Sequence, residues 1–201
     1  MKIGTDGVLL GAIASGFPCT RVLDIGTGCG LIALMLAQET KAIITGIDLD
    51  PDAIERASLN AGATPWSKNV HFICSPFQRF ARDASESFDL IVCNPPFFVN
   101  SLVSADAKRT TSRHAHTLPL AELFDGVNKL LKAGGTFVII LPHSQKEEAV
   151  SSAARYQLNI QACWDISPKP GRKPHRAVLA FGYENHRPAY HFLTVETEER
   201  H

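Results

Sequence analysis

The chain has 201 residues, of which 45% are hydrophobic and 20% are charged, a composition typical of one globular domain with a sizeable core. The formal net charge is zero, which argues against recognition of nucleic acid by the charge of the whole surface. No run approaches the ~20 apolar residues that a membrane span requires, and the first residues lack the pattern of a secretory signal. We expect one cytoplasmic domain over residues 1–201, without a membrane segment.

Short apolar runs alternate with helical patterns along the chain. We predict helices over 31–39, 52–61, 77–82, 118–132 and 144–156, and strands over 21–25, 42–48, 70–74, 88–93, 136–141, 158–166 and 176–181. The helix over 118–132 should stop at Gly134 and Gly135. This alternation predicts an α/β fold, in which helices cover both faces of a mostly parallel sheet. The last two strands have only a basic loop between them, so they should pair antiparallel.

Five cysteines occur, and they are widely spaced and form no CxxC pair: Cys19, Cys29, Cys74, Cys93 and Cys163. Neither a zinc site nor a disulfide framework is indicated by this spacing, so we predict no metal. We interpret the cysteines as small buried side chains in a reducing compartment.

Ligands of parallel sheets bind beyond the carboxyl ends of the strands. In this chain the rule brings three segments to one crevice, and they are residues 26–30, 48–50 and 94–97.

The segment after the first predicted strand is a glycine loop preceded by an acid. It reads Asp24-Ile-Gly26-Thr-Gly28-Cys-Gly30, and its G-x-G-x-G spacing differs from the G-x-G-x-x-G of dinucleotide enzymes. A pyrophosphate would be repelled by the carboxylate of Asp24, whereas the ammonium group of an amino-acid tail would be attracted to it. The loop therefore favours S-adenosylmethionine over a nicotinamide cofactor, although a purely structural turn is the alternative.

Asp48 ends the second predicted strand and can accept hydrogen bonds from both hydroxyls of a ribose. Leu49 can pack on the face of an adenine. Asp50 precedes Pro51 and is better explained as the N-cap of the next helix.

The tetrapeptide Asn94-Pro95-Pro96-Phe97 directly follows the fourth predicted strand. The two prolines fix φ and remove two N–H donors, which leaves the Asn94 side-chain carbonyl and the Pro95 backbone carbonyl as acceptors. Two such acceptors can hold both N–H groups of a planar amine and free its lone pair to attack a methyl group, while Phe97 stacks on the planar group. We predict an N-methyltransferase site here, with a simple strand-ending turn as the alternative.

Four segments of the chain resemble bacterial valine-tRNA (adenine-37-N6)-methyltransferases, and together they cover nearly its whole length. They are KIGTDGVLLG at 2–11, VLDIGTGCGL at 22–31, NPPFF at 94–98 and PHRAVLAF at 174–181. The resemblance implies a Rossmann-like class I methyltransferase fold with a seven-stranded, mostly parallel sheet whose last strand is antiparallel. It also implies that Thr5 and Asp6 flank S-adenosylmethionine and that Asp48 holds its ribose.

The same resemblance implies a tRNA partner whose adenine beside the anticodon is unstacked to enter the site. Candidate contacts to the RNA backbone are the basic residues Arg109, Arg113, Lys173 and Arg176. Members of the family usually carry an acid after the third strand, where this chain has Ser75 as a candidate contact to the cofactor's adenine. Members also extend beyond both ends of this sequence, so it is expected to be trimmed there.

Several alternatives stay open from the sequence. An rRNA guanine N2 or a protein glutamine amide offers the same planar amine, and a non-catalytic module that binds cofactor or RNA is a remote possibility. The two basic clusters, within 108–116 and 169–176, can be solvated loops. The sequence does not decide between a monomer and a homodimer.

Overall fold

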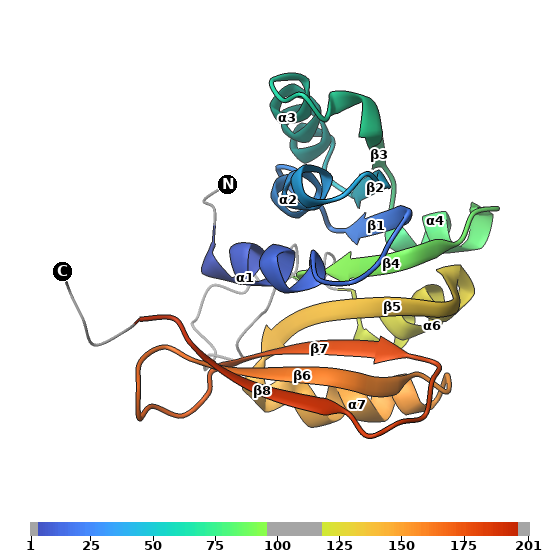
Figure 1. Cartoon of the computed structure of the whole chain (residues 1–201). Helices are drawn as coiled ribbons and strands as arrows, with labels where there is room; N and C mark the ends of the chain where they lie inside the picture. Colours follow the sequence, from blue (N-terminus) through green and yellow to red (C-terminus); the bar gives the residue numbers. More distant parts are fainter. Residues whose placement is uncertain (1–3, 96–117, 197–201) are drawn as a thin grey trace, which may run out of the picture.

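The computed structural model describes residues 4–95 and 118–196. In this part of the chain, six α-helices and two short 3₁₀ helices accompany the strands of one sheet (Figure 1). The helices are α1 (Thr5–Ala14), α2 (Leu31–Glu39), α3 (Pro51–Gly62), η1 (Ser67–Asn69), α4 (Phe77–Asp83), α6 (Leu120–Leu130), η2 (His143–Gln145) and α7 (Lys146–Ala154). The strands are β1 (Arg21–Ile25), β2 (Ile43–Asp48), β3 (Val70–Cys74), β4 (Phe88–Cys93), β5 (Leu131–Pro142), β6 (Asn159–Ser167), β7 (Arg176–Gly182) and β8 (Ala189–Thr194).

The strands form a single sheet in the order β3-β2-β1-β4-β5-β7-β6-β8. All neighbouring pairs are parallel except the two that involve β7, which runs antiparallel to β5 and to β6. The predicted antiparallel pairing of the strands over 158–166 and 176–181 is therefore confirmed.

The predicted number of strands was wrong, because the described residues form eight rather than seven. The additional strand, β8, follows Pro188 and pairs in parallel with β6 at the edge of the sheet. All six of its residues are exposed, so it lacks the buried apolar run by which the other strands were recognised. The strand that is antiparallel to its neighbours is thus the seventh of eight along the chain.

The structure differs from the predicted elements at two further places. The segment Thr5–Ala14 forms helix α1, for which no element was predicted, and it buries Gly7, Leu10, Gly11 and Ala14 on one face. Helix α6 ends at Leu130 and passes directly into β5, so Gly134 and Gly135 lie inside the strand's first part rather than at the helix end. Burial against neighbouring elements outweighs the weak local helix signal of glycine and the stop signal of the glycine pair.

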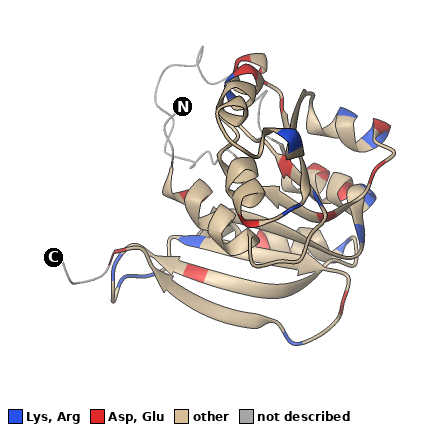
Figure 2. Ribbon diagram, turned by 45° about the horizontal axis from the view of Figure 1, so that its top comes forward, with Lys and Arg blue, Asp and Glu red and all other residues tan. Residues whose placement is uncertain are grey.

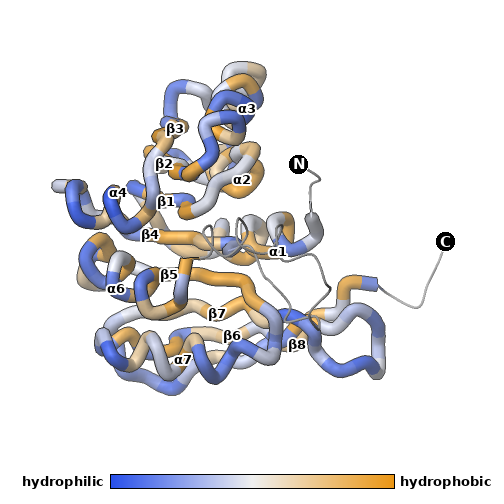
Figure 3. Tube along the Cα trace, turned by 180° about the vertical axis from the view of Figure 1, so that it is seen from behind, coloured by the Kyte–Doolittle hydropathy of each residue, from blue (hydrophilic) through white to orange (hydrophobic). Residues whose placement is uncertain are grey.

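Two apolar clusters, one on each face of the sheet, form the core. Most charged residues belong to helices and loops (Figure 2), whereas the hydrophobic colour is concentrated on β4, β5 and β7 in the middle of the molecule (Figure 3). In the larger cluster, Phe124 of α6 is fully buried and packs edge-on against Phe137 and Phe181, with ring centroids 5.5 and 5.2 Å apart. This aromatic group fastens α6 to β5 and β7.

Replacing Phe124 with alanine should lower the free energy of unfolding by about 3–5 kcal/mol, because the cavity lies among buried rings that cannot collapse into it. The measurement is urea unfolding followed by circular dichroism. Phe192→Ala is the matched control, since this phenylalanine is 78% exposed, and its effect should stay within about 0.5 kcal/mol. Equal losses in the two variants would contradict this assignment of the core.

Candidate active site

The register of the parallel strands brings three functional segments into one row. Ile25 of β1 pairs with Ile47 of β2 on one side and with Cys93 of β4 on the other. The residues that follow these three are Gly26, Asp48 and Asn94, so they lie side by side at the carboxyl edge of the sheet. Backbone pairing between distant parts of the chain therefore brings together the three segments that the sequence predicted to share a ligand site.

The glycine loop between β1 and α2 is held open by backbone hydrogen bonds to β2. The N–H groups of Gly26 and Thr27 both donate to the Ile47 carbonyl at 2.9 Å. Gly26, Gly28 and Gly30 have positive φ angles of 71°, 58° and 82°, a region that residues with a Cβ rarely adopt. The chain can therefore turn tightly here and present its backbone to a ligand at the start of α2.

The carboxylate of Asp24 lies directly beneath this loop and is completely buried. Its Oδ2 accepts a hydrogen bond from the Thr27 hydroxyl at 2.7 Å, while its Oδ1 is buried without a hydrogen-bond partner among the described residues. Burial raises the pKa of Asp24 from 3.8 to about 6, although the Thr27 hydroxyl and the nearby backbone N–H of Ala33 act to lower it, and the charge of Asp48 raises it further. A buried acceptor without a partner fits a cationic ligand group.

Asp48, at the end of β2, is partly exposed and holds the backbone on both sides of it. Its Oδ2 accepts from the Gly28 N–H at 2.9 Å, and its Oδ1 accepts from the Asp50 N–H at 3.0 Å. A carboxylate oxygen has two lone pairs, so both oxygens keep acceptor capacity towards the crevice. Asp48 thus ties the glycine loop to β2 in addition to the ribose contact predicted for it.

The residues that follow β2 and β3 form the next part of the edge. The Ser75 N–H donates to the Asp48 carbonyl at 2.9 Å, which places Ser75 directly beside Asp48. Leu49, which follows Asp48, is 47% exposed at this edge. Asp50 accepts from the Asp52 N–H and caps α3, as its position before Pro51 predicted.

Asn94 and Pro95 follow β4 and are both partly exposed at the same edge. Pro96 and Phe97 lie outside the described residues. The side chain of Asn94 faces the first turn of α1, because a Cβ built on Gly7 would lie 3.8 Å from its Nδ2 atom. The preceding Cys93 is completely buried, and burial raises the pKa of its thiol, so this cysteine stays protonated and offers no nucleophile to the site.

Helix α1 forms one side of the candidate site, and the order of the motifs along the chain did not predict it. Its first turn carries Thr5, which is exposed, and Asp6, which was assigned to the cofactor. In the structure, Asp6 Oδ2 accepts a hydrogen bond from Arg176 Nε at 2.9 Å. Apolar residues surround α1 instead of lining one face, so hydrophobic periodicity offered no signal for this helix.

The predicted RNA contacts divide into three groups. Arg109 and Arg113 lie outside the described residues. Lys173 is exposed in the loop between β6 and β7, where Figure 2 shows several basic segments. Arg176 begins β7 and is partly buried with Asp6. Because β7 runs antiparallel to both β5 and β6, the strand β6 runs in the same direction as β4 and β5, and the loop after it projects from the same sheet edge as Asn94.

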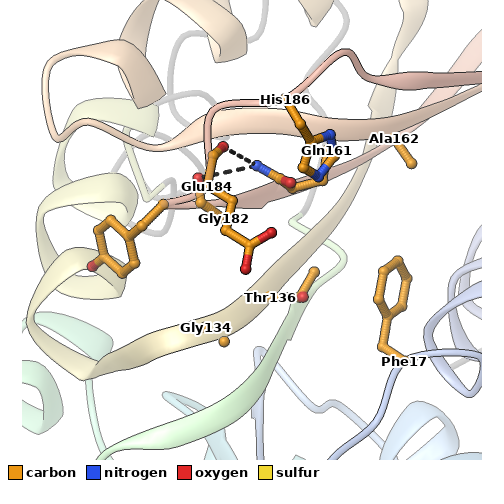
Figure 4. A pocket seen from close by; sticks show the side chains of 10 residues that line it. Phe17, Gly134, Thr136, Gln161, Ala162, Gly182, Glu184 and His186 are labelled. Atoms are coloured by element: carbon orange, nitrogen blue, oxygen red, sulfur yellow. Dashed lines mark hydrogen bonds between the residues drawn. The ribbon is translucent and has the colours of Figure 1, made fainter.

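A hollow of about 310 Å³ opens at the other edge of the sheet, between Phe17 and the ends of β5 and β7 (Figure 4). The Gln161 amide nitrogen donates there to the carbonyls of Glu184 and Gly182, at 2.7 and 3.4 Å. The Gln161 side chain therefore stabilises the end of β7 through these hydrogen bonds. The hollow lies at the amino edge, away from the glycine loop and from Asn94, so we do not assign the reaction to it.

Comparison with known proteins agrees with this geometry. A family model described as a methyltransferase domain matches residues 18–178. The tRNA1(Val) (adenine(37)-N6)-methyltransferase of Parabacteroides distasonis is 40% identical over 199 residues, which are 98% of this chain and 84% of that protein. The protein of the same name from Yersinia enterocolitica is 40% identical over 89% of this chain and 72% of its own length.

Solved structures share the fold at low sequence identity. A predicted O-methyltransferase from Agrobacterium tumefaciens has a TM-score of 0.71 and 15% identity, with 98% of this chain and 89% of that chain covered. A TehB-like SAM-dependent methyltransferase from Corynebacterium glutamicum has a TM-score of 0.59 and 21% identity, with 91% and 89% covered. The fold, the glycine loop and the matching model define the class, the S-adenosylmethionine-dependent methyltransferases with a Rossmann-like sheet. Within this class, the chain belongs to the family of tRNA1(Val) (adenine(37)-N6)-methyltransferases.

Within 4–95 and 118–196, no helix is both long and apolar enough to cross a membrane. In the same ranges, no three His, Cys, Asp or Glu side chains gather into a group that could hold a metal ion.

The raised pKa of Asp24 predicts that this carboxylate destabilises the protein without its ligand. A carboxyl group with a higher pKa in the folded than in the unfolded state favours folding only while protonated, so stability is lost as the pH rises from about 4 to about 6. Above this window the loss amounts to about 3 kcal/mol. Asp24→Asn should therefore raise the free energy of unfolding at pH 7.5 by about 1–3 kcal/mol, with the gain disappearing towards pH 4.

The measurement is urea unfolding of the ligand-free protein at pH 4.5, 6 and 7.5. Asp52→Asn removes an exposed carboxylate of α3 and serves as the control, with an expected effect below about 0.5 kcal/mol at each pH. A stabilisation by Asp24→Asn that is the same at all three pH values would show that ionisation of this group is not the cause.

Proposed function

We propose that this chain transfers the methyl group of S-adenosylmethionine to N6 of adenine 37 in a valine tRNA, and that Asn94 and Pro95 hold the accepting amine. The single observation that carries the proposal is the row formed by the glycine loop, Asp48 and Asn94 at one sheet edge. The names of relatives at 36–40% identity support the choice of acceptor.

The described residues fit the cofactor. The buried Oδ1 of Asp24 lacks a partner and suits the ammonium group of the methionine part, directly or through water. Asp48 retains lone pairs for the two ribose hydroxyls, and the exposed Leu49 offers an apolar face to the adenine. Ser75 lies beside Asp48, where the adenine amine can be recognised. Thr5, in the first turn of α1, is proposed to border the cofactor site on the side of Asn94.

S-adenosylmethionine supplies a methyl group on a sulfonium, which departs as a neutral thioether and needs no assistance from an acid. The task of the protein is therefore positioning and stabilisation of the positive charge that develops on the amine. The Asn94 side-chain oxygen and the Pro95 carbonyl accept the two N–H groups of the adenine amine. These hydrogen bonds strengthen as the amine becomes more acidic in the transition state.

One N–C bond forms from the nitrogen lone pair, and one C–S bond breaks with its electron pair left on sulfur. The amine, positively charged after the attack, loses one proton to solvent. Cys93 takes no part, because burial keeps its thiol protonated. Pro96 and Phe97 complete the acceptor motif in the sequence, with Phe97 proposed to stack on the adenine ring.

The tRNA should approach along the carboxyl edge of the sheet. The zero net charge leaves this role to local basic segments, and the loop between β6 and β7 carries exposed Lys169, Arg172 and Lys173. Adenine 37 lies beside the anticodon and has to leave its stack to reach Asn94, which the single-stranded loop makes possible. Arg109 and Arg113 are proposed as further backbone contacts. The proposed compartment is the cytoplasm, and a monomer and a homodimer are both compatible with this site.

The two rival acceptors are an rRNA guanine and a protein glutamine amide, because they present the same planar amine. Incubation with labelled S-adenosylmethionine and either tRNA, rRNA or release factor separates the three. Nucleoside mass spectrometry should detect N6-methyladenosine in the valine tRNA only. Tight cofactor binding without methyl transfer to any of these substrates would instead support a non-catalytic module that binds cofactor or RNA.

Asn94→Ala should lower kcat by about 100-fold or more, because one of the two acceptors for the amine is lost in the transition state. Cofactor affinity should change by less than about threefold, since the glycine loop and Asp48 remain. The measurement combines single-turnover kinetics on valine tRNA with calorimetric binding of the cofactor. Asn185→Ala, at an exposed position between β7 and β8, should leave both quantities unchanged. Near-normal turnover of Asn94→Ala would sink the mechanism.

Lys173→Gln should weaken tRNA binding and reduce the slope of log K against log salt by about one, as expected for the loss of one phosphate contact. Filter binding of valine tRNA between 50 and 200 mM salt, about the range in which such contacts are resolved, gives this slope. Lys68→Gln is the control, because Lys68 is exposed before β3 at the opposite edge of the sheet. Unchanged binding by Lys173→Gln would place the RNA elsewhere.

A further inference from the structure

Two sequence motifs from opposite ends of the chain meet beside the active site. Asp6, in the GTDG segment, and Arg176, in the PHR segment, form an ion pair with 2.9 Å between Oδ2 and Nε. Their side chains are 25% and 28% exposed, so the pair is shielded from bulk water on most sides. Because the pair is partly buried, its hydrogen bond depends more closely on the positions of the two side chains than the contact of a pair on the open surface does.

The acidic partner lies in the turn of α1 that touches the acceptor motif. Gly7 is buried next to Asp6, and a Cβ placed on it would lie 3.1 Å from Leu31 Cδ2 and 3.8 Å from Asn94 Nδ2. The first turn of α1 therefore forms a wall against the Asn94 side chain. The N-cap of α1 is Gly4, whose lack of a side chain leaves the helix without a side-chain cap. The position of this turn has to come from a contact outside the helix.

The basic partner lies on a rigid part of the sheet. Arg176 is the first residue of β7 and pairs with Pro142 of β5 and with Ile166 of β6. The carbonyl before it, on His175, accepts hydrogen bonds from the His143 N–H at 3.1 Å and from Arg176 Nη1 at 3.2 Å. The position of Arg176 at the start of β7 thus directs its guanidinium towards α1. Strand β7 pairs with β5, and β5 pairs with β4, the strand that Asn94 follows.

We propose that Asp6 and Arg176 are positioning residues, which hold the first turn of α1 against Asn94 so that the amide keeps the orientation needed to accept the amine. This inference rests on the proposed function and gives both residues a role that differs from direct contact with cofactor or RNA. The pair couples the helix that borders the cofactor to the strand that borders the RNA loop. Loss of either charge frees the turn of α1 and lets the Asn94 side chain leave its orientation.

The test is a double-mutant cycle of Asp6→Asn, Arg176→Gln and the combination, with kcat, the KM for valine tRNA and the cofactor Kd measured for each. Each single variant should lower kcat by about 10- to 100-fold, the range expected when a reacting group is misplaced by about an ångström. The double variant should be no slower than the slower single variant, because one interaction is removed in all three. Arg176→Lys should recover part of the loss. Arg187→Gln, at an exposed position between β7 and β8 at the opposite edge of the sheet, is the control with unchanged kcat.

Hydrogen exchange of the backbone amides in residues 4–10 provides a second readout that does not depend on the substrate. Exchange should accelerate in both single variants and should not accelerate further in the double variant. If the wild-type enzyme failed to methylate adenine, the proposed function would fall while this exchange pattern could still support the ion pair. Where a variant fails to fold, Asp6→Glu and Arg176→Lys complete the cycle with smaller changes.

Three results would overturn the proposal. An increase in the KM for tRNA with unchanged kcat in Arg176→Gln, additive with Asp6→Asn, would make Arg176 a phosphate contact. A weaker cofactor Kd in Asp6→Asn alone would make Asp6 a direct cofactor ligand. Unchanged amide exchange in both single variants would show that the pair does not hold α1.

Discussion

The parallel pairing of β1 with β2 and with β4 is the constraint on which the rest of this site depends. Because strands in register end together, the glycine loop, Asp48 and Asn94 are delivered to one edge from three separate parts of the chain. The cofactor half and the acceptor half are then adjacent without any dedicated connection between them. A slip by one residue would turn Asn94 to the other face of the sheet and separate the two halves.

The buried carboxylate of Asp24 shows how this arrangement trades stability for binding. Its unpartnered Oδ1 and its raised pKa indicate that the buried negative charge lowers the stability of the fold. Under the proposed function, the ammonium group of the cofactor compensates that charge, so that the cofactor and the folded state stabilise each other. Asp48 serves the opposite purpose, because its two backbone hydrogen bonds lock the glycine loop before any ligand is present. Asp48 thus holds the glycine loop in place, and Asp24 is proposed to attract the ligand.

The acceptor side depends on longer-range contacts than the cofactor side. The net charge of zero means that tRNA has to be guided by local groups, and not every basic residue of the carboxyl edge is available for this purpose. Lys173 is exposed, whereas Arg176 is engaged with Asp6 of α1. Under our proposal the basic loop binds the RNA backbone, and the first residue of β7 instead maintains the wall behind Asn94. Binding and alignment of the adenine are then separate tasks of neighbouring residues.

The sequence by itself determined the α/β class, the helix α2, both boundaries of β1, β3 and β4, and the motifs of the glycine loop and of Asn94, because each depends on a short stretch of chain. Only the tertiary structure decided the helix α1, the edge strand β8 and the pairing of Asp6 with Arg176. Helix α1 contains two glycines and is stabilised by burial against α2 and β5, while β8 is exposed along its whole length. The ion pair joins residues 170 positions apart, and local periodicity carries no information about a contact that the completed sheet alone brings together.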